Sequence, residues 1–337
     1  MSVKVCIVGA GAIGGLFAGW IGSRIPAREI ELSAFARGAT LAALRRDGLR
    51  LESASATEET GTIPLRAEAD TRLLGAQDLV VLAVKGPALG SVAPAVAPLL
   101  GPGTAVLVAM NGVPWWFFDG VSAGPCAGLR LASVDPGGVV RAAIPTAHVI
   151  GCVVHASSTA PRPGAVRHVM GNGLIIGEPA GGRSARTDAL ESLLTRAGFA
   201  ITVSEHIQRD IWYKLWGNMT MNPVSALTGA TCDRILDDEL VRGFCSAVMR
   251  EAQALGAQFG CAIGQTPEQR HDVTRRLGAF KTSMLQDLEA GRALEIDALV
   301  GAVREIGRHL GQPTPGIDAL FGLVRLLAQS RGLYPRG

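Results

Sequence analysis

The chain has 337 residues, 48% of them hydrophobic and 18% charged, and its formal net charge is +3. This composition excludes a disordered chain, and the length predicts two domains. The small net charge and the lack of a lysine- or arginine-rich block argue against a nucleic-acid partner. Because no apolar run reaches the ~18 residues of a transmembrane helix, a membrane partner is not expected either.

Cysteine and histidine spacing gives no sign of a metal site. The six cysteines are scattered, and none forms a CxxC pair or lies at zinc-ligand spacing from a histidine. The apolar run at residues 3–8 is too short for the core of a signal peptide and leads directly into a glycine loop. We therefore expect reduced cysteines, no metal and a cytoplasmic location.

The first half of the sequence alternates apolar strands with helix-like segments. Strands are predicted at residues 3–8, 29–36, 79–84 and 105–110, and helices at 12–23 and near 88–100. This alternation predicts a mainly parallel sheet with helices on both faces, which is an α/β, Rossmann-like N-terminal domain over residues 1–204. Residues 148–155 and 174–177 either extend this sheet or form an antiparallel edge.

From about Glu205 the strand signals stop, and long segments with helical periodicity follow. Helices are predicted at residues 207–222, 237–259, 267–290, 295–310 and 317–330. We therefore expect an all-α C-terminal domain over residues 205–337. Pro223 should kink or end the first of these helices. The glycine-rich stretch 120–138 is expected to be a loop.

A glycine motif follows the first predicted strand and opens the first predicted helix. The loop reads Gly9-Ala10-Gly11-Ala12-Ile13-Gly14. Gly9 allows a tight turn, Gly11 lets the backbone approach a pyrophosphate, and Gly14 lets the helix pack closely on the strand. The alternative is a glycine-rich turn without a ligand, but the strand–loop–helix context favours dinucleotide binding through these six residues.

The end of the second predicted strand indicates which dinucleotide binds. NAD-binding domains place an acidic residue there, which accepts a hydrogen bond from the ribose 2′-hydroxyl. This chain has Arg37 after the strand instead, and Glu31 lies at the strand's start. An arginine can form a bidentate pair with the 2′-phosphate of NADP, so NADP(H) is the predicted cofactor. The alternative is an exposed arginine without a ligand.

Two polar residues follow the next two predicted strands. Lys85 follows residues 79–84, Asn111 follows residues 105–110, and a glycine comes after each. Ligands of open α/β sheets bind beyond the carboxyl ends of the strands. We therefore assign Lys85 and Asn111 to the cofactor site. The alternatives are an ordinary exposed lysine and an Asn-Gly turn.

A polar stripe runs along the first helix of the second half. Lys214, Asn218 and Asn222 are spaced four residues apart and therefore lie on one helix face. Tryptophan, leucine and methionine surround them, so the helix should be largely buried and its polar face needs partners. A desolvated lysine suits the donation of a proton to a carbonyl that is being reduced. The alternative is the solvated face of an ordinary amphipathic helix.

A hydroxyl and a carboxylate form a third candidate pair. Ser283 is predicted on a helix, and Glu295 at the start of the next helix, where the dipole favours a carboxylate. Together they could bind a hydroxylated substrate. Taken alone, they are at least as well explained as a helix-surface hydroxyl and a helix cap.

Taken together, these motifs resemble the ketopantoate reductase (2-dehydropantoate 2-reductase) family over nearly the whole chain. The ordered set comprises the glycine loop, Arg37, Val84-Lys85, Asn111-Gly112, Lys214-Leu215, Asn218, Asn222-Pro223, the run Ser283-Met284-Leu285-Gln286-Asp287, and Glu295-Ile296-Asp297. The resemblance implies that NADPH reduces the 2-keto group of ketopantoate to give (R)-pantoate, a precursor of pantothenate and coenzyme A.

The resemblance also implies roles for individual residues. Lys214 would be the catalytic general acid. The substrate would be bound by Asn218, Asn222, Ser283 and Glu295, with Asn111 near both the nicotinamide and the substrate. Arg37 and Lys85 would hold the adenosine 2′-phosphate. A small-molecule 2-keto acid is therefore the expected partner. From the high apolar content of the chain, we also expect a homodimer that forms through the helical domain.

Two stretches depart from the family pattern. The bulky run Trp115-Trp116-Phe117-Phe118 follows Asn111-Gly112 and is interpreted as core or as a pocket wall. The loop over residues 120–147 is also longer than usual. These departures leave open a reductase of a different 2-keto acid in the same family. A second alternative is a non-catalytic NADP(H) sensor, although a sensor has no need of Lys214 as a proton donor.

Overall fold

The computed structural model describes residues 2–53 and 60–335. The chain forms two compact units, each built from two segments of the sequence. The first unit comprises Met1–Met110 and Gly138–Ile207, and the second comprises Asn111–Gly137 and Gln208–Gly337. Residues 111–137 therefore pack with the helical part of the chain, although strands flank them in the sequence.

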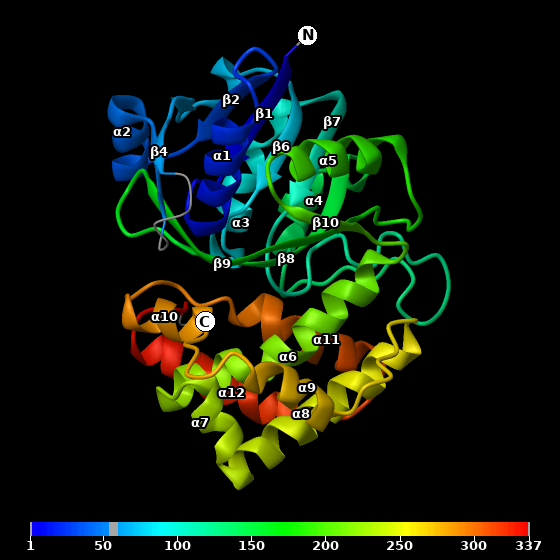
Figure 1. Cartoon of the computed structure of the whole chain (residues 1–337). Coiled ribbons are helices and arrows are strands. Elements are labelled where there is room, and N and C mark those ends of the chain that lie inside the picture. Colours follow the sequence, from blue (N-terminus) through cyan, green and yellow to red (C-terminus); the bar gives the residue numbers. More distant parts are fainter. Residues whose placement is uncertain (1, 54–59, 336–337) are drawn as a thin grey trace. The chain divides into compact units, whose positions relative to one another are not determined.

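The first unit is built on one twisted sheet (Figure 1). Over the described residues, the strands are β1 Val3–Val8, β2 Ile30–Phe35, β3 Leu49–Ser53, β4 Gly61–Ile63, β5 Arg66–Glu68, β6 Gln77–Leu82, β7 Leu100–Val108, β8 Val149–Thr159, β9 Ala165–Gly177 and β10 Ala200–Val203. Their order is β4-β3-β9-β8-β7-β6-β1-β2-β5, and β10 pairs with β9. The pairs β8–β9 and β3–β4 are antiparallel and the other pairs are parallel.

This sheet confirms the predicted mainly parallel α/β fold. The segments around residues 148–155 and 174–177 extend it as β8 and β9. Because β6, β1 and β2 are parallel neighbours, their carboxyl ends lie at one edge of the sheet. The loops that follow these three strands carry the glycine motif, Arg37 and Lys85, which are therefore brought to the same edge.

The helices of the first unit are short. They are α1 Ala12–Arg24, α2 Gly38–Asp47, α3 Gly86–Val92, α4 Val139–Ala143 and α5 Ala185–Arg196. The helix-like stretch expected near residues 88–100 consists of α3, which ends at Val92, and two short 3₁₀ turns, Ala93–Ala95 and Ala97–Leu99. Pro94 and Pro98 lie in those turns. Proline has no backbone N–H and therefore interrupts the α-helical hydrogen bonds.

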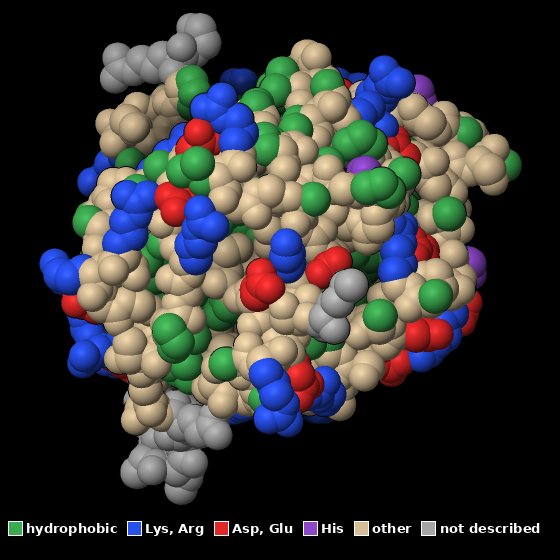
Figure 2. Space-filling model, turned by 90° about the horizontal axis from the view of Figure 1, so that it is seen from above, with side chains coloured by type: hydrophobic (Ala, Val, Ile, Leu, Met, Phe, Trp, Pro, Cys, Tyr) green, Lys and Arg blue, Asp and Glu red, His purple; other side chains and the backbone are tan. Residues whose placement is uncertain are grey.

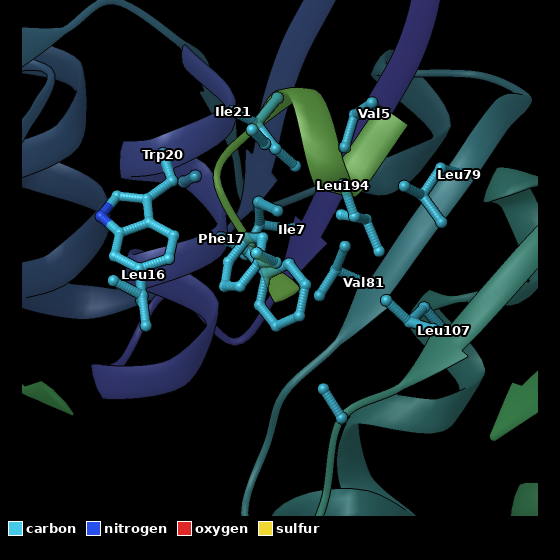
Figure 3. Packing of buried hydrophobic residues seen from close by; sticks show 14 of the residues in the cluster. Val5, Ile7, Leu16, Phe17, Trp20, Ile21, Leu79, Val81, Leu107 and Leu194 are labelled. Atoms are coloured by element: carbon cyan, nitrogen blue, oxygen red, sulfur yellow. The ribbon is translucent and has the colours of Figure 1, made fainter. Parts of the chain in front are cut away.

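The core of the first unit lies between α1 and the sheet. Ile7 of β1, Val81 of β6 and Leu107 of β7 are completely buried, and Phe17 of α1 packs among them (Figure 3). The side chains of β1 from Val5 to Val8 are all 0% exposed. Burial on both faces explains the unbroken apolar run that marked this strand in the sequence.

The second unit is helical, as predicted. Its helices are α6 Ile207–Thr228, α7 Cys232–Asp237, α8 Glu239–Gln258, α9 Pro267–Arg275, α10 Ser283–Glu289, the π-helix η6 Asp297–Gly301, α11 Ala302–His309 and α12 Pro315–Ser330. The segment predicted as one helix over residues 267–290 is two helices. Gly278 has a φ of +62° after α9, and Thr282 caps α10 by accepting a hydrogen bond from the Leu285 N–H.

Pro223 does not end α6, which continues to Thr228. The residues on either side of the proline, Asn222 and Val224, are 6% and 4% exposed. Packing around this segment therefore holds the helix together although proline removes one backbone hydrogen bond.

The aromatic run after Asn111 forms part of the core of the second unit. Trp115, Trp116, Phe117 and Phe118 are between 0% and 2% exposed. Phe117 packs against Trp212 of α6, and both Phe117 and Phe118 meet Phe259 edge to face. These rings anchor the loop over residues 111–137 to the helices.

Candidate active site

The glycine loop joins β1 to α1 in a conformation that requires glycine at two of its positions. Gly9 has a φ of +97°, and a Cβ there would come within 2.8 Å of the Val84 Cγ1 atom. A Cβ at Gly14 would overlap the carbonyl oxygen of Gly9. The first turn of α1 therefore packs directly on the end of β1 and on the segment that leads to Lys85.

Gly11 differs from the other two glycines of the motif. A Cβ at this position would meet no atom within 4 Å, so the chain's own packing does not explain a glycine here. No side chain caps the N-terminus of α1, and its first turn contains no acidic residue. Open space beside an uncapped helix N-terminus fits an anionic ligand such as a pyrophosphate.

Arg37 lies two residues beyond Phe35, the last residue of β2. Its side chain is exposed, and its guanidinium carbon lies 5.0 Å from the centre of the Phe35 ring. Over residues 2–53 and 60–335, no carboxylate forms an ion pair with it. Glu31 lies near the opposite end of β2, where it accepts a hydrogen bond from the Ser2 hydroxyl. The edge at which the glycine loop lies therefore carries a cation where NAD-binding domains carry an acid.

Lys85 lies three residues beyond β6 and immediately precedes α3. Its side chain is exposed. Because β6 is the parallel neighbour of β1, Lys85 and Arg37 flank the glycine loop on its two sides. Two cations beside the open space at Gly11 suit a phosphorylated ligand.

In the second unit, α6 brings the predicted lysine into contact with the predicted asparagine. The Lys214 Nζ atom donates a hydrogen bond of 3.0 Å to the Asn111 Oδ1 atom. Both side chains are half-buried. Leu215, Trp216 and Met219 pack the opposite side of the helix and are at most 2% exposed, so the orientation of the lysine about the helix axis is fixed.

The loop that carries Asn111 is held by the π-helix η6. The Val113 N–H donates a hydrogen bond of 2.8 Å to the Ala298 carbonyl oxygen. Gly112 has a φ of +83°, and a Cβ there would lie 2.5 Å from that same oxygen. Asn111 and Gly112 therefore form a turn that touches η6, which begins two residues after Glu295.

The other predicted substrate residues differ in burial. Asn222 is 6% exposed and Glu295 is 9% exposed, while Asn218 is half-buried. Ser283 is the first residue of α10 and its side chain is exposed. In the described part of the chain, no hydrogen bond joins Ser283 to either asparagine.

Asp297 and Tyr334 were missed by the sequence analysis as a pair. The Tyr334 hydroxyl donates a hydrogen bond of 2.7 Å to the Asp297 Oδ1 atom. Burial raises the pKa of the Asp297 carboxyl, whereas the bond from Tyr334 and the charge of Arg325 lower it. Asp297 belongs to the run Glu295-Ile296-Asp297 on which the family resemblance partly rests. No local sequence pattern pointed to Tyr334, near the end of the chain.

Residues 2–53 and 60–335 contain no group of histidine, cysteine, aspartate and glutamate side chains that could hold a metal ion. They also contain no helix that combines the length and the hydropathy needed to cross a membrane. On the face seen in Figure 2, basic side chains lie among acidic and neutral ones and form no continuous patch.

Comparison with known sequences and structures identifies the family. The family "Ketopantoate reductase PanE/ApbA" matches residues 5–114, and its C-terminal counterpart matches residues 206–328. A 2-dehydropantoate 2-reductase from Mesorhizobium japonicum is 46% identical over 332 residues, which cover 98% of this chain and 100% of the relative.

Solved structures show the same fold. A crystal structure of a candidate ketopantoate reductase from Ralstonia solanacearum superimposes with a TM-score of 0.92 at 58% identity, covering 99% of this chain and 100% of that chain. D-mandelate dehydrogenase shares the fold at 18% identity, with a TM-score of 0.82 and coverage of 98% and 100%. The chain therefore belongs to the ketopantoate reductase family and is an oxidoreductase that acts on a CH–OH group.

Proposed function

We propose that this chain reduces 2-dehydropantoate (ketopantoate) to (R)-pantoate with NADPH, a step of pantothenate and coenzyme A biosynthesis. The observation that carries the proposal is the contact between the Lys214 ammonium and the Asn111 amide oxygen. This contact would orient a proton donor. The chain is also 46% identical, over nearly its full length, to a relative named 2-dehydropantoate 2-reductase.

The cofactor part of the proposal concerns the domain over residues 1–204. The pyrophosphate would lie on the loop from Gly9 to Gly14, where the space beside Gly11 is open. Arg37 and Lys85 would hold the adenosine 2′-phosphate through charge-assisted hydrogen bonds. Bound NADPH supplies the hydride. The structures of D-mandelate dehydrogenase contain NADH, which supports a nicotinamide cofactor for this fold.

The catalytic part concerns Lys214 and Asn111. As hydride adds to the keto carbon, negative charge develops on the carbonyl oxygen, and the Lys214 ammonium would stabilise it and then transfer a proton to it. The product is a secondary alcohol, and the lysine is left neutral until it regains a proton from solvent. Asn111 would hold the amine in place during this transfer and lie near the nicotinamide.

The substrate part concerns the polar residues of the domain over residues 205–337. Asn218, Asn222 and Ser283 would donate hydrogen bonds to the keto acid. The Glu295 carboxylate would accept a hydrogen bond from the terminal hydroxyl of ketopantoate. Glu295 is 9% exposed, so its carboxylate would exchange a hydrogen bond with the substrate in largely desolvated surroundings.

The second hypothesis, a reductase of a different 2-keto acid, rested on the run Trp115-Trp116-Phe117-Phe118. These side chains are enclosed in the core with Trp212 and Phe259 and have no free surface with which to line a binding pocket. That burial removes the observation on which the second hypothesis rested. The non-catalytic sensor is disfavoured because it has no use for an ammonium held beside an amide at 3.0 Å.

Steady-state turnover tests the proposal directly. We expect oxidation of NADPH with ketopantoate at a kcat/KM at least about tenfold above that with a panel of other 2-keto acids, a difference of ~1.4 kcal/mol in transition-state binding. A higher value for another 2-keto acid would establish the second hypothesis. Binding of NADPH without turnover of any keto acid would establish the sensor.

Two further predictions concern the state of the protein in the cell. A homodimer through the helical domain is supported by Leu323 and Leu326 of α12, which are 56% and 65% exposed. A cytoplasmic location is supported by the six cysteines, which lie among the described residues, are buried and form no disulfide. Sedimentation of the purified chain would measure its oligomeric state.

A further inference from the structure

The C-terminal segment after α12 reaches the π-helix that follows Glu295. The Tyr334 hydroxyl donates its 2.7 Å hydrogen bond to Asp297, the first residue of η6. Both side chains are half-buried. The positive charge of Arg325 in α12 also acts on this carboxyl and lowers its pKa. The hydroxyl therefore supplies the direct hydrogen bond that this partly desolvated carboxylate requires.

The π-helix is an irregular turn that packing must hold in place. Its widened hydrogen bond runs from the Ala302 N–H to the Asp297 carbonyl oxygen, five residues back. Gly301 leaves room for the carboxylate, since a Cβ there would lie 3.3 Å from the Asp297 Oδ1 atom and 3.2 Å from the Phe321 ring. The position of the Asp297 side chain is thus tied to the shape of the turn.

The same turn holds the loop that carries Asn111. The Ala298 carbonyl, one residue after Asp297, accepts the hydrogen bond from the Val113 N–H, and Gly112 packs against it without room for a side chain. Asn111 in turn accepts the hydrogen bond from Lys214. A continuous set of contacts therefore leads from Tyr334 through η6 and the Asn111 turn to the Lys214 ammonium.

We propose that Tyr334 is a positioning residue, which fixes η6 through Asp297 and thereby keeps Asn111 in register with Lys214. The catalytic consequence rests on the proposed function of Lys214, but the structural link does not. Removal of the hydroxyl should loosen the turn by a fraction of an ångström or more. Misplacement of about 1 Å at a catalytic group lowers turnover by roughly 10- to 100-fold.

The variant Tyr334→Phe removes only the hydroxyl. The chain has one other tyrosine, Tyr213, whose hydroxyl donates a 2.8 Å hydrogen bond to the Gln265 side chain, so Tyr213→Phe is a matched control. Amide hydrogen exchange is measured first, because it needs no substrate. We expect Tyr334→Phe to speed exchange in the peptide that contains Val113 while peptides of β1 are unchanged, and Tyr213→Phe to leave Val113 protected. Unchanged protection of Val113 in Tyr334→Phe overturns the proposal.

Turnover then tests the catalytic consequence. We expect a roughly tenfold or greater loss of kcat in Tyr334→Phe with an unchanged Kd for NADPH, and almost no loss in Tyr213→Phe. In an Asn111→Ala background, Tyr334→Phe should cause no further loss of kcat, because both changes disturb one unit. An equal loss of kcat in both backgrounds overturns the proposal.

Asp297 offers a second variant in case Tyr334→Phe folds poorly. Asp297→Asn keeps an oxygen that can accept the Tyr334 hydrogen bond and should retain much more kcat than Asp297→Ala. Equal losses in these two variants contradict the proposal. If the wild-type chain reduces no 2-keto acid, the proposed function fails, while the exchange of Val113 still decides the role of Tyr334.

Discussion

The Lys214 ammonium donates a hydrogen bond of 3.0 Å to the Asn111 amide oxygen, although 103 residues separate the two in the sequence. An amide oxygen is a neutral acceptor, so this contact orients the ammonium without cancelling its charge. In the proposed reaction, the ammonium would supply both a positive charge and a proton to the oxyanion that develops during reduction.

Replacement of Lys214 by alanine should lower kcat by about 10²- to 10⁴-fold, the range that a positioned general acid contributes. The Kd for NADPH should change little, because the residues proposed to hold its phosphates, which are the glycine loop, Arg37 and Lys85, all belong to the first unit. Single-turnover kinetics and a cofactor titration measure the two effects. Lys281→Ala is the control, since the exposed Lys281 is paired with Glu289, the last residue of α10, and should be dispensable. Unchanged kcat in Lys214→Ala would reject the assignment.

The glycine loop predicts opposite effects for two alanine substitutions. Gly11→Ala adds a methyl group where no atom lies within 4 Å, so the free energy of unfolding should change by no more than about 0.5 kcal/mol. The same methyl group would lie in the space proposed for the pyrophosphate, and the Kd for NADPH should rise about tenfold or more. Thermal unfolding and a cofactor titration of one preparation measure both quantities.

Gly14→Ala should instead destabilise the fold, because its methyl group would overlap the Gly9 carbonyl oxygen. Overpacking of this kind typically costs about 1–3 kcal/mol. If Gly11→Ala proves as destabilising as Gly14→Ala, the space beside Gly11 is not open in solution. If Gly11→Ala leaves the Kd unchanged, the phosphate does not bind there.

The choice between NADPH and NADH should depend on Arg37. Loss of a charge-assisted hydrogen bond costs about 1.5–3 kcal/mol, so Arg37→Gln should raise the Kd for NADPH roughly 10- to 100-fold. The Kd for NADH should barely change, because NADH lacks the 2′-phosphate. Arg46→Gln on the nearby α2 is the control, since Arg46 is paired with Asp47. An equal rise in the Kd for both cofactors would show that Arg37 does not bind the 2′-phosphate.

Local features of the fold could be predicted from the sequence, because each is set by residues close together in the chain. The run from β1 through Gly9, Gly11 and Gly14 into α1 is one strand, one turn and one helix. The spacing of Lys214, Asn218 and Asn222 follows directly from helix geometry. These patterns mark the glycine loop of the first unit and the polar stripe of the second from the sequence alone.

Features that depend on distant contacts could not be predicted. The insertion of β9 between β8 and β3 pairs Arg50 with Ala165, and no local pattern encodes that neighbour. The π-helix at Asp297–Gly301 has no recognisable sequence signal, and its hydrogen-bond partners, the Tyr334 hydroxyl and the Val113 N–H, are distant in the sequence. Continuation of α6 past Pro223 likewise depends on tertiary packing, which overrides the local preference of proline.

Glu295 should determine whether a terminal hydroxyl on the substrate is recognised. Glu295→Gln should raise the KM for ketopantoate by roughly tenfold, because a hydrogen bond to a charged group is replaced by a weaker neutral one. For a 2-keto acid that lacks the terminal hydroxyl, the KM should be nearly the same in Glu295→Gln as in the wild type. Comparison of kcat/KM for the two substrates in both proteins separates recognition from stability. An equal loss for both substrates would make Glu295 a structural residue.

Stability should fall in alkaline solution because of the buried thiols. Burial raises the pKa of Cys245 and of Cys261 to about 12, and that of Cys6 and of Cys232 to about 11. In the unfolded chain these thiols ionise near a pKa of about 8.5. Protons are therefore retained by the folded state and lost by the unfolded state as the pH rises through this window, so the free energy of unfolding decreases.

Denaturant unfolding in a reducing buffer, at about pH 8 and about pH 10, measures this decrease. Cys245→Ala should lower the stability at about pH 8, since it removes a buried side chain, but should also make the loss at about pH 10 smaller than in the wild type. The same thiols should react with an alkylating reagent only after unfolding, because the thiolate is the reactive form. A loss of stability as large in Cys245→Ala as in the wild type would mean that other groups, such as lysines, control the alkaline transition.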